Sequence, residues 1–194
     1  MSKKVIALLA EGFEEVEAVT PIDYLRRAGI EVTIAVLGNG LTVRGSHGIR
    51  LAADAVLDDL AGEGKLKPSS WDAVVVPGGL PGADNLAASK QVGDFLKGMA
   101  AAGKLIAAIC ASPARVLAPL GLLAEKKFTC YPGEEKNIPS SILAGAEWKE
   151  DSVVVDGNLI TSRGAGTAGE FACAIIGKLV GQEEAKKLAD KVLL

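Results

Sequence analysis

The sequence predicts an α/β protein with a doubly wound, mostly parallel sheet and helices on both faces. Short aliphatic runs alternate with helical patterns along the chain, as in successive β-α-β units. Hydrophobic residues make up 49% of the 194 residues and aromatic residues only 4%, so Ala, Val, Leu and Ile must form most of the core. Aliphatic runs of this kind are typical of parallel strands buried on both faces.

The first third of the chain contains two predicted strands with a helix between them. The first strand is expected at residues 5–10 and the helix at 14–28, where apolar residues recur about every three positions. Pro21 is expected to kink or break this helix. The second strand is expected at residues 30–36, and the glycine-bearing stretch 41–51 predicts an exposed β-arm.

The middle of the chain repeats the alternation. A buried strand is expected at residues 71–76, and Pro77-Gly78-Gly79 ends it sharply. A helix at 89–102 precedes an aliphatic strand at 105–109. A further helix is expected to begin at Cys110-Ala111-Ser112-Pro113, since proline suits a first helical turn.

The C-terminal part contains a predicted hairpin and two helices. Asp156-Gly157-Asn158 lies between the aliphatic runs 153–155 and 159–161, which is a hairpin pattern. A long helix is expected at 167–180, followed by a short terminal helix. No linker or internal repeat interrupts the pattern, so one domain is expected over residues 1–194.

Composition excludes several classes of function. The net charge of −3 argues against a broad nucleic-acid or anionic-membrane surface. No apolar run approaches the roughly 18 residues of a membrane span, and residues 5–10 are too short an apolar run for a signal peptide. The spacing of the three cysteines indicates neither a disulfide framework nor a zinc site. We therefore expect a protein of the reducing cytoplasm without metal or cofactor.

Three strand ends are expected to meet at one edge of the sheet. They are residues 11–17 after the first strand, 77–79 after the Trp71 strand, and Cys110 after the Leu105 strand. The carboxyl ends of parallel strands share an edge, and ligands bind there in open α/β sheets. A ligand site is therefore predicted at this edge.

Cys110 lies at a predicted elbow between a strand and a helix. Its small neighbours leave room for a tight turn, and amides at the helix N-terminus favour a thiolate. A buried, inert cysteine fits the same spacing equally well. Cys173, in an apolar helical pattern, is expected in the core, and the pattern leaves Cys130 undecided.

The groups near Cys110 also have two interpretations. Gly78 and Gly79 can form an oxyanion hole or a plain turn. Among Glu11, Glu14, Glu15 and Glu17, several suit a helix start, and periodicity does not choose an acid/base group. The sole histidine, His47, is not placed near Cys110 by the sequence, which makes a Cys-His hydrolase doubtful.

The stretch 164–169 matches GxGxxG, the dinucleotide fingerprint. That fingerprint belongs to a βαβ unit with an acidic residue ending the second strand. Here only more helix follows, so a tight turn without phosphate is the preferred interpretation.

Four segments together closely resemble the ThiJ/PfpI superfamily, and most closely its branch with the Parkinson-disease-linked protein deglycase and bacterial relatives. The likeness runs in order from about Lys3 to Leu194. The segments are Glu11-Gly12-Phe13-Glu14-Glu15-Val16-Glu17, Pro77-Gly78-Gly79, Ala107-Ala108-Ile109-Cys110-Ala111-Ser112-Pro113 and Thr161-Ser162-Arg163-Gly164.

The resemblance implies a flavodoxin-like sandwich, usually a homodimer. It implies that Cys110 oxidises readily to a sulfinate beside a protonated Glu17, with the amides of Gly79 and Ala111 as anion-stabilising donors. It further implies a deglycase or glyoxalase that acts on methylglyoxal and its adducts, or an oxidative-stress protein or chaperone. Some bacterial relatives are linked to thiamine-thiazole biosynthesis.

The sequence departs from this branch at one position. A histidine before proline is expected near the cysteine, and Tyr131 stands there, before Pro132. Tyrosine is a poor base near neutral pH because its reference pKa is about 10. A mechanism that uses Cys110 and Glu17 survives this change. Cys130 is a less favoured candidate to resolve a Cys110 sulfenate.

Three classes of function follow. The leading hypothesis is an enzyme in which Cys110 attacks a 2-oxoaldehyde and Glu17 transfers a proton. The second is a non-catalytic redox sensor or stress-response chaperone that uses oxidation of Cys110. An amidotransferase or PfpI-type peptidase is disfavoured because no histidine follows Cys110.

Overall fold

The computed structural model describes residues 2–143 and 145–194. Its main sheet has seven strands in the order β10-β11-β7-β6-β1-β2-β5, and all neighbours are parallel except the β10–β11 hairpin. The strands are β1 (Lys4–Ala10), β2 (Glu31–Leu37), β5 (Ala55–Val56), β6 (Ala73–Val76), β7 (Leu105–Ile109), β10 (Val153–Asp156) and β11 (Leu159–Ser162).

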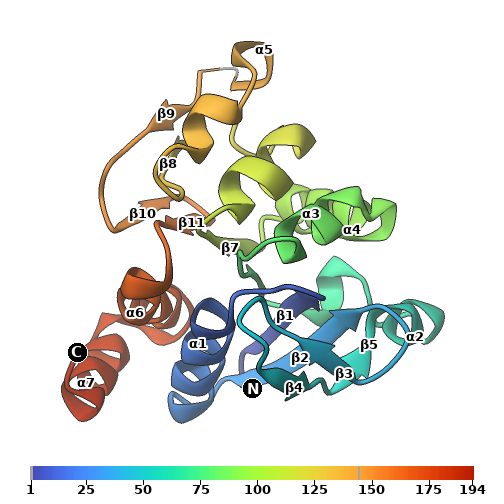
Figure 1. Cartoon of the computed structure of the whole chain (residues 1–194). Helices are drawn as coiled ribbons and strands as arrows, with labels where there is room; N and C mark the ends of the chain where they lie inside the picture. Colours follow the sequence, from blue (N-terminus) through green and yellow to red (C-terminus); the bar gives the residue numbers. More distant parts are fainter. Residues whose placement is uncertain (1, 144) are drawn as a thin grey trace.

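Helices cover both faces of the sheet (Figure 1). They are α1 (Glu15–Arg27), α2 (Leu57–Gly62), α3 (Gly82–Ala88), α4 (Lys90–Ala101), α5 (Ser140–Leu143), α6 (Ala168–Val180) and α7 (Gln182–Val192). Alternate residues of β1 point to opposite faces: Ile6 and Leu8 join a core with α2, α3 and α4, whereas Val5 and Leu9 join a core with α1, α6 and α7. The doubly wound α/β prediction is confirmed.

The predicted β-arm is also present. It consists of β3 (Thr42–Arg44) and β4 (Arg50–Ala52), paired antiparallel. The arm packs against the segment that leads into α1, because the Gly12 amide donates to the Arg44 carbonyl and the Ser46 amide to the Phe13 carbonyl, both at 2.8 Å.

Some local expectations were wrong. The chain after Cys110 forms a π-helical turn (Pro113–Leu117) and a 3-10 turn (Ala118–Leu120) instead of a regular α-helix. Two prolines, Pro113 and Pro119, withhold amide donors here, so an i to i−4 ladder cannot form throughout. Conversely, α1 continues through Pro21 as one helix.

The short elements were missed, since they carry too few residues for a periodic pattern. These are β5, α2, α3, α5 and the two-stranded pair β8 (Lys127–Phe128) and β9 (Glu147–Trp148).

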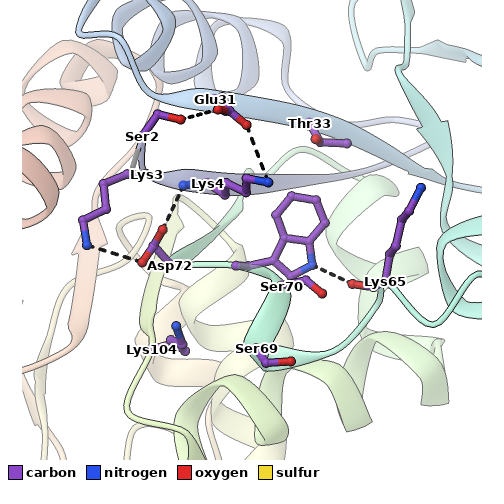
Figure 2. A pocket seen from close by; sticks show the side chains of 11 residues that line it. Ser2, Lys3, Lys4, Glu31, Thr33, Lys65, Ser69, Ser70, Asp72 and Lys104 are labelled. Carbon is purple, nitrogen blue, oxygen red and sulfur yellow. Dashed lines mark hydrogen bonds and ion pairs between the residues drawn. The ribbon is translucent and has the colours of Figure 1, made fainter.

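A charged cavity of about 580 Å³ lies at the amino ends of the strands (Figure 2). Four lysines and two acids are among its lining residues. Asp72 accepts from the Lys4 amide at 2.9 Å and from the Lys3 ammonium at 3.4 Å. These contacts tie the starts of β1 and β6 together at the edge opposite to Cys110, which follows the end of β7.

Among the described helices, none combines the length and apolar character needed to cross a membrane.

Candidate active site

Cys110 occupies a strained elbow at the carboxyl end of β7. Its φ of 65° lies in the left-handed region, which is uncommon for residues other than glycine. The Cys110 amide donates to the Ser162 carbonyl at 2.9 Å, and its carbonyl accepts from the Tyr131 amide at 2.8 Å. Because neighbouring segments hold the backbone on both sides, the strain is maintained, a feature that clusters at functional sites.

Glu17 lies directly against Cys110. Its carboxyl group, on a residue only 1% exposed, is hydrogen-bonded to the Cys110 sulfur. The Gly78 amide donates to Glu17 Oε2 at 2.9 Å, and the Ala165 amide also donates to this carboxyl group. The fold therefore brings α1, the end of β6, the elbow and the turn after β11 together around one carboxyl group.

The other glutamates near the start of α1 have different partners. Glu14 caps the helix by accepting from the Glu17 amide at 2.7 Å. Glu11 accepts from the Arg44 amide at 3.1 Å. Three-dimensional contacts thus make the choice among the four carboxylates that helical periodicity did not make.

His47 belongs to the β-arm and pairs with Glu15. Its Nδ1 lies 2.9 Å from Glu15 Oε2, and its amide donates to Glu15 Oε1 at 2.8 Å. Burial acts to raise the pKa of Glu15, but the hydrogen bonds from His47 and Ile49 outweigh it and lower that pKa to about 2. Glu14, Glu15 and His47 are close enough to share a cation, yet these hydrogen bonds already satisfy Glu15 without one.

Two backbone amides face the Cys110 sulfur, those of Gly79 and Ala111. Gly79 has a φ of +89°, and a Cβ there would lie 2.3 Å from the Glu14 amide nitrogen, so the close approach requires glycine. The Ser112 hydroxyl donates to the Pro77 carbonyl at 2.6 Å and ties the elbow to this loop. The arrangement is an anion-binding nest built around a thiol.

Cys110 and Glu17 titrate as a pair. Burial raises the pKa of Glu17 from 4.5 to about 7, helped by the charge of Glu14. Burial, and next the charge of Glu17, raises the pKa of Cys110 well above its ordinary value, against the effect of the two amides. The amides favour the thiolate, as expected from the elbow, but burial and Glu17 outweigh them. Above about pH 7 the pair holds one proton and one negative charge between its two groups.

Tyr131 stands at the side of this pair. It is 52% exposed, and its ring lies beside Gly164, where a Cβ would be 3.5 Å from Tyr131 Cδ2 and 3.8 Å from Glu17 Oε1. The ring therefore forms a wall of the site, next to the turn that contacts Glu17.

The remaining cysteines have separate surroundings. Cys130 is fully buried, and its sulfur has the Glu135 amide and the Trp148 indole as neighbours, in place of the donors that face Cys110. Cys173, expected in the core, is only partly buried, although it packs against the core beneath α6.

The GxGxxG segment supports Glu17. It forms a 3-10 turn (Ala165–Thr167) in which the Thr167 hydroxyl lies 2.6 Å from the Ser162 hydroxyl. Donation from the Ala165 and Gly78 amides to Glu17 carried no signal in the sequence, because a backbone donor has no residue type to reveal it.

We predict that Gly78→Ala destabilises the protein. A Cβ at this position would lie 2.7 Å from Cys110 Cβ and 2.8 Å from Glu17 Oε2. Overpacking of this kind typically costs about 1–3 kcal/mol, which urea unfolding would measure. Gly62→Ala is the matched control because nothing lies within 4 Å of its Cβ. Equal unfolding free energies in the two variants would contradict tight packing at Gly78.

A family profile described as "DJ-1/PfpI family" matches residues 3–178. Parkinson disease protein 7 homolog of Danio rerio is 40% identical over 99% of this chain and 97% of its own. A protein of Caenorhabditis elegans named glutathione-independent glyoxalase DJR-1.2 is 35% identical over 97% of this chain and 95% of its own.

Protein DJ-1 homolog B of Arabidopsis thaliana is 43% identical over 98% of this chain, which spans only 41% of that relative's length. The chain also spans less than half the length of protein DJ-1 homolog A of Arabidopsis thaliana. Among solved structures, Drosophila melanogaster DJ-1beta superposes with a TM-score of 0.88 at 41% identity, covering 100% of this chain and 99% of the other. The resemblance seen in the sequence is confirmed.

Proposed function

Because this chain belongs to the DJ-1/PfpI family, we propose that it converts methylglyoxal and related 2-oxoaldehyde adducts to hydroxy acids without a cofactor, as a glyoxalase or deglycase. The observation that carries the proposal is the buried hydrogen bond between Glu17 and Cys110, with the Gly79 and Ala111 amides facing the same sulfur. The printed name of the Caenorhabditis elegans relative supports the same class of reaction.

The first step is addition to the aldehyde. The Cys110 thiolate, formed when the shared proton resides on Glu17, attacks the aldehyde carbon and gives a hemithioacetal. The developing oxyanion accepts hydrogen bonds from the Gly79 and Ala111 amides, which are held in place before the reaction and need no reorganisation.

The second step is proton transfer. The Glu17 carboxylate, after giving its proton to the hemithioacetal oxygen, removes the proton from the former aldehyde carbon while the ketone oxygen takes up a proton, which gives an enediol. Glu17 then returns a proton to the neighbouring carbon, and the hydroxyl group on the sulfur-bearing carbon loses its proton. The product is a thioester of a 2-hydroxy acid, and water hydrolyses it to regenerate the Cys110 thiol. A pKa near 7 suits Glu17 to both directions of transfer near neutral pH. Neither step needs a histidine, so Tyr131 acts here only as a wall.

The test is product formation from methylglyoxal alone. We expect the protein to form lactate without glutathione, and in D₂O the lactate should carry deuterium at C2, because the carboxyl proton of Glu17 exchanges with solvent. Proton NMR would detect both. Absence of lactate at micromolar protein would reject the proposed activity.

Redox sensing is the second candidate. The two amides and a protonated Glu17 would also stabilise the negative charge of an oxidised Cys110. Intact-mass measurement after mild peroxide separates this candidate from simple oxidative damage. Gain of two oxygens on Cys110 before Cys130 or Cys173 reacts would support sensing, and reaction in any other order would count against it.

The homodimer and the cytoplasmic location remain predictions. Val16 and Val19 of α1 are 48% and 43% exposed, and Ile49 of the arm is 61% exposed. The Ile49 amide donates to Glu15 Oε1, which places it at the start of the same helix. This apolar strip suits a second copy of the chain. Sedimentation velocity should show a dimer in the parent protein and a monomer in Val16→Glu; a monomeric parent would refute the dimer.

A further inference from the structure

Arg115, five residues after Cys110, binds the two other chain segments that flank the thiol. Its Nε and Nη2 donate to the two carboxylate oxygens of Glu134 at 2.8 and 3.0 Å, and its Nη1 donates to Asp84 Oδ1 at 2.9 Å. The Arg115 side chain is 31% exposed and that of Glu134 only 14%. A bidentate Arg–carboxylate pair fixes the relative orientation of the two side chains as well as their distance.

The Glu134 contact holds the segment that carries Tyr131. The Glu134 amide donates to the Tyr131 carbonyl at 3.0 Å, and the Tyr131 amide donates to the Cys110 carbonyl at 2.8 Å. Arg115 therefore holds the Glu134 end of a short segment, and Tyr131 at its other end is bonded to Cys110 and carries the ring that forms the wall of the site.

The Asp84 contact holds the segment that carries Gly79. Asp84 lies in the first turn of α3, and the neighbouring Ala83 amide donates to the Gly79 carbonyl at 2.8 Å. On the elbow side, the Arg115 amide donates to the Ala111 carbonyl at 2.9 Å. The two residues whose amides face the sulfur are thus each bonded through their carbonyls to a segment that Arg115 joins: Gly79 to the first turn of α3, which the guanidinium holds at Asp84, and Ala111 to the backbone of Arg115 itself.

We propose that Arg115 is a positioning residue, which sets the spacing between the Gly79 and Ala111 amides and keeps Tyr131 against the site. The catalytic part of this inference rests on the proposed function. Partly exposed ion pairs contribute little to overall stability, whereas a donor misplaced by about 1 Å can cost up to about a hundredfold in rate. Only the planar guanidinium group of arginine can donate to both carboxylates in this way, so lysine cannot replace Arg115.

The experiment compares Arg115→Gln and Arg115→Lys with Arg26→Gln, which removes an exposed ion pair of similar length to Asp54, at 3.0 Å. Arg115→Gln should lower kcat for methylglyoxal about tenfold, with a much smaller change in KM, because the amides act on the oxyanion that forms during reaction. Arg115→Lys should recover little of the loss, and Arg26→Gln should match the parent. Adding Glu134→Gln to Arg115→Gln should lower kcat no further.

Amide hydrogen exchange supplies a readout that needs no turnover. Exchange of the segment 131–138 should accelerate in Arg115→Gln and remain unchanged in Arg26→Gln. Faster exchange with an unchanged kcat would overturn the positioning role and leave a structural one. Exchange at the parental rate would show that the Arg115 contacts do not hold this segment, and it would overturn the proposal. If the parent protein makes no lactate, the proposed function fails. The exchange result still decides whether Arg115 holds the segments of Glu134 and Asp84 in place.

Discussion

Cys110→Ser should lower lactate formation from methylglyoxal by at least about a thousandfold, in line with removal of a nucleophile in other enzymes. A serine hydroxyl at this elbow would meet the same two amides and the same carboxyl group. Its proton is far harder to remove than that of a thiol, so the hemithioacetal cannot form. Initial rates of lactate formation, with urea unfolding as a check on folding, measure the effect.

Cys173→Ser is the control for Cys110→Ser. Cys173 is a partly buried thiol on α6 and takes no part in the proposed steps, so this variant should keep the parental rate. Parental turnover in Cys110→Ser would refute the nucleophile and, with it, the reaction sequence proposed for this site.

Glu17→Gln should lower turnover by about a hundredfold to ten-thousandfold, the usual contribution of a general acid–base group. Glutamine retains an acceptor for the Gly78 and Ala165 amides but has no proton to shuttle. In the parent, kcat/KM should rise with pH through about 7, where Glu17 and Cys110 come to share a single proton. That inflection should be missing in Glu17→Gln, and a profile unchanged by the substitution would contradict the coupling of the two groups.

The same substitution should stabilise the protein at alkaline pH. The folded-state pKa of Glu17 is raised from 4.5 to about 7, so the folded state holds a proton that the unfolded state has lost. The parent therefore loses stability as pH rises from about 4.5 to about 7, by roughly 2–3 kcal/mol in all. Glu17→Gln lacks this loss.

Urea unfolding at two pH values tests this second effect of Glu17→Gln. The free energy of unfolding of the variant should gain on that of the parent by roughly 2–3 kcal/mol between pH 4.5 and pH 8.5. Glu11→Gln, an exposed carboxylate beside the same helix, should show no such gain. A variant that loses activity and gains stability at alkaline pH would show that burial of Glu17 lowers the stability of the protein but is required for its activity.

The sheet was predictable because long buried strands leave a strong pattern. β1, β2, β6 and β7 consist almost wholly of aliphatic residues, and each lies within two residues of its expected position. The elements that were missed, such as β5 and α3, are short, and tertiary contacts rather than periodicity define them. The helix expected after Cys110 failed for a local reason, the missing amide donors of Pro113 and Pro119.

The candidate site was predictable only in outline. The convergence of three strand ends follows from parallel topology, so the neighbourhood of Cys110, the Gly79 loop and the glutamates could be expected from the sequence. The contact of Glu17 with Cys110 was expected only from the family resemblance. Two sets of contacts could not be predicted from the sequence: those of the Gly78 and Ala165 amides with Glu17, and those of Arg115 with Glu134 and Asp84. They join segments far apart in the chain, and no local pattern shows that such segments lie close together.

The sequence by itself therefore determined a doubly wound α/β fold and a cysteine at the carboxyl edge of its sheet. Local chemistry settles those two features: aliphatic runs must be buried, and a strand that ends at an elbow must present its next residue at the sheet edge. Only the tertiary structure decided the protonation of that cysteine. Burial beside Glu17 raises the pKa of both groups, and burial is a property of the packed molecule rather than of any segment in it.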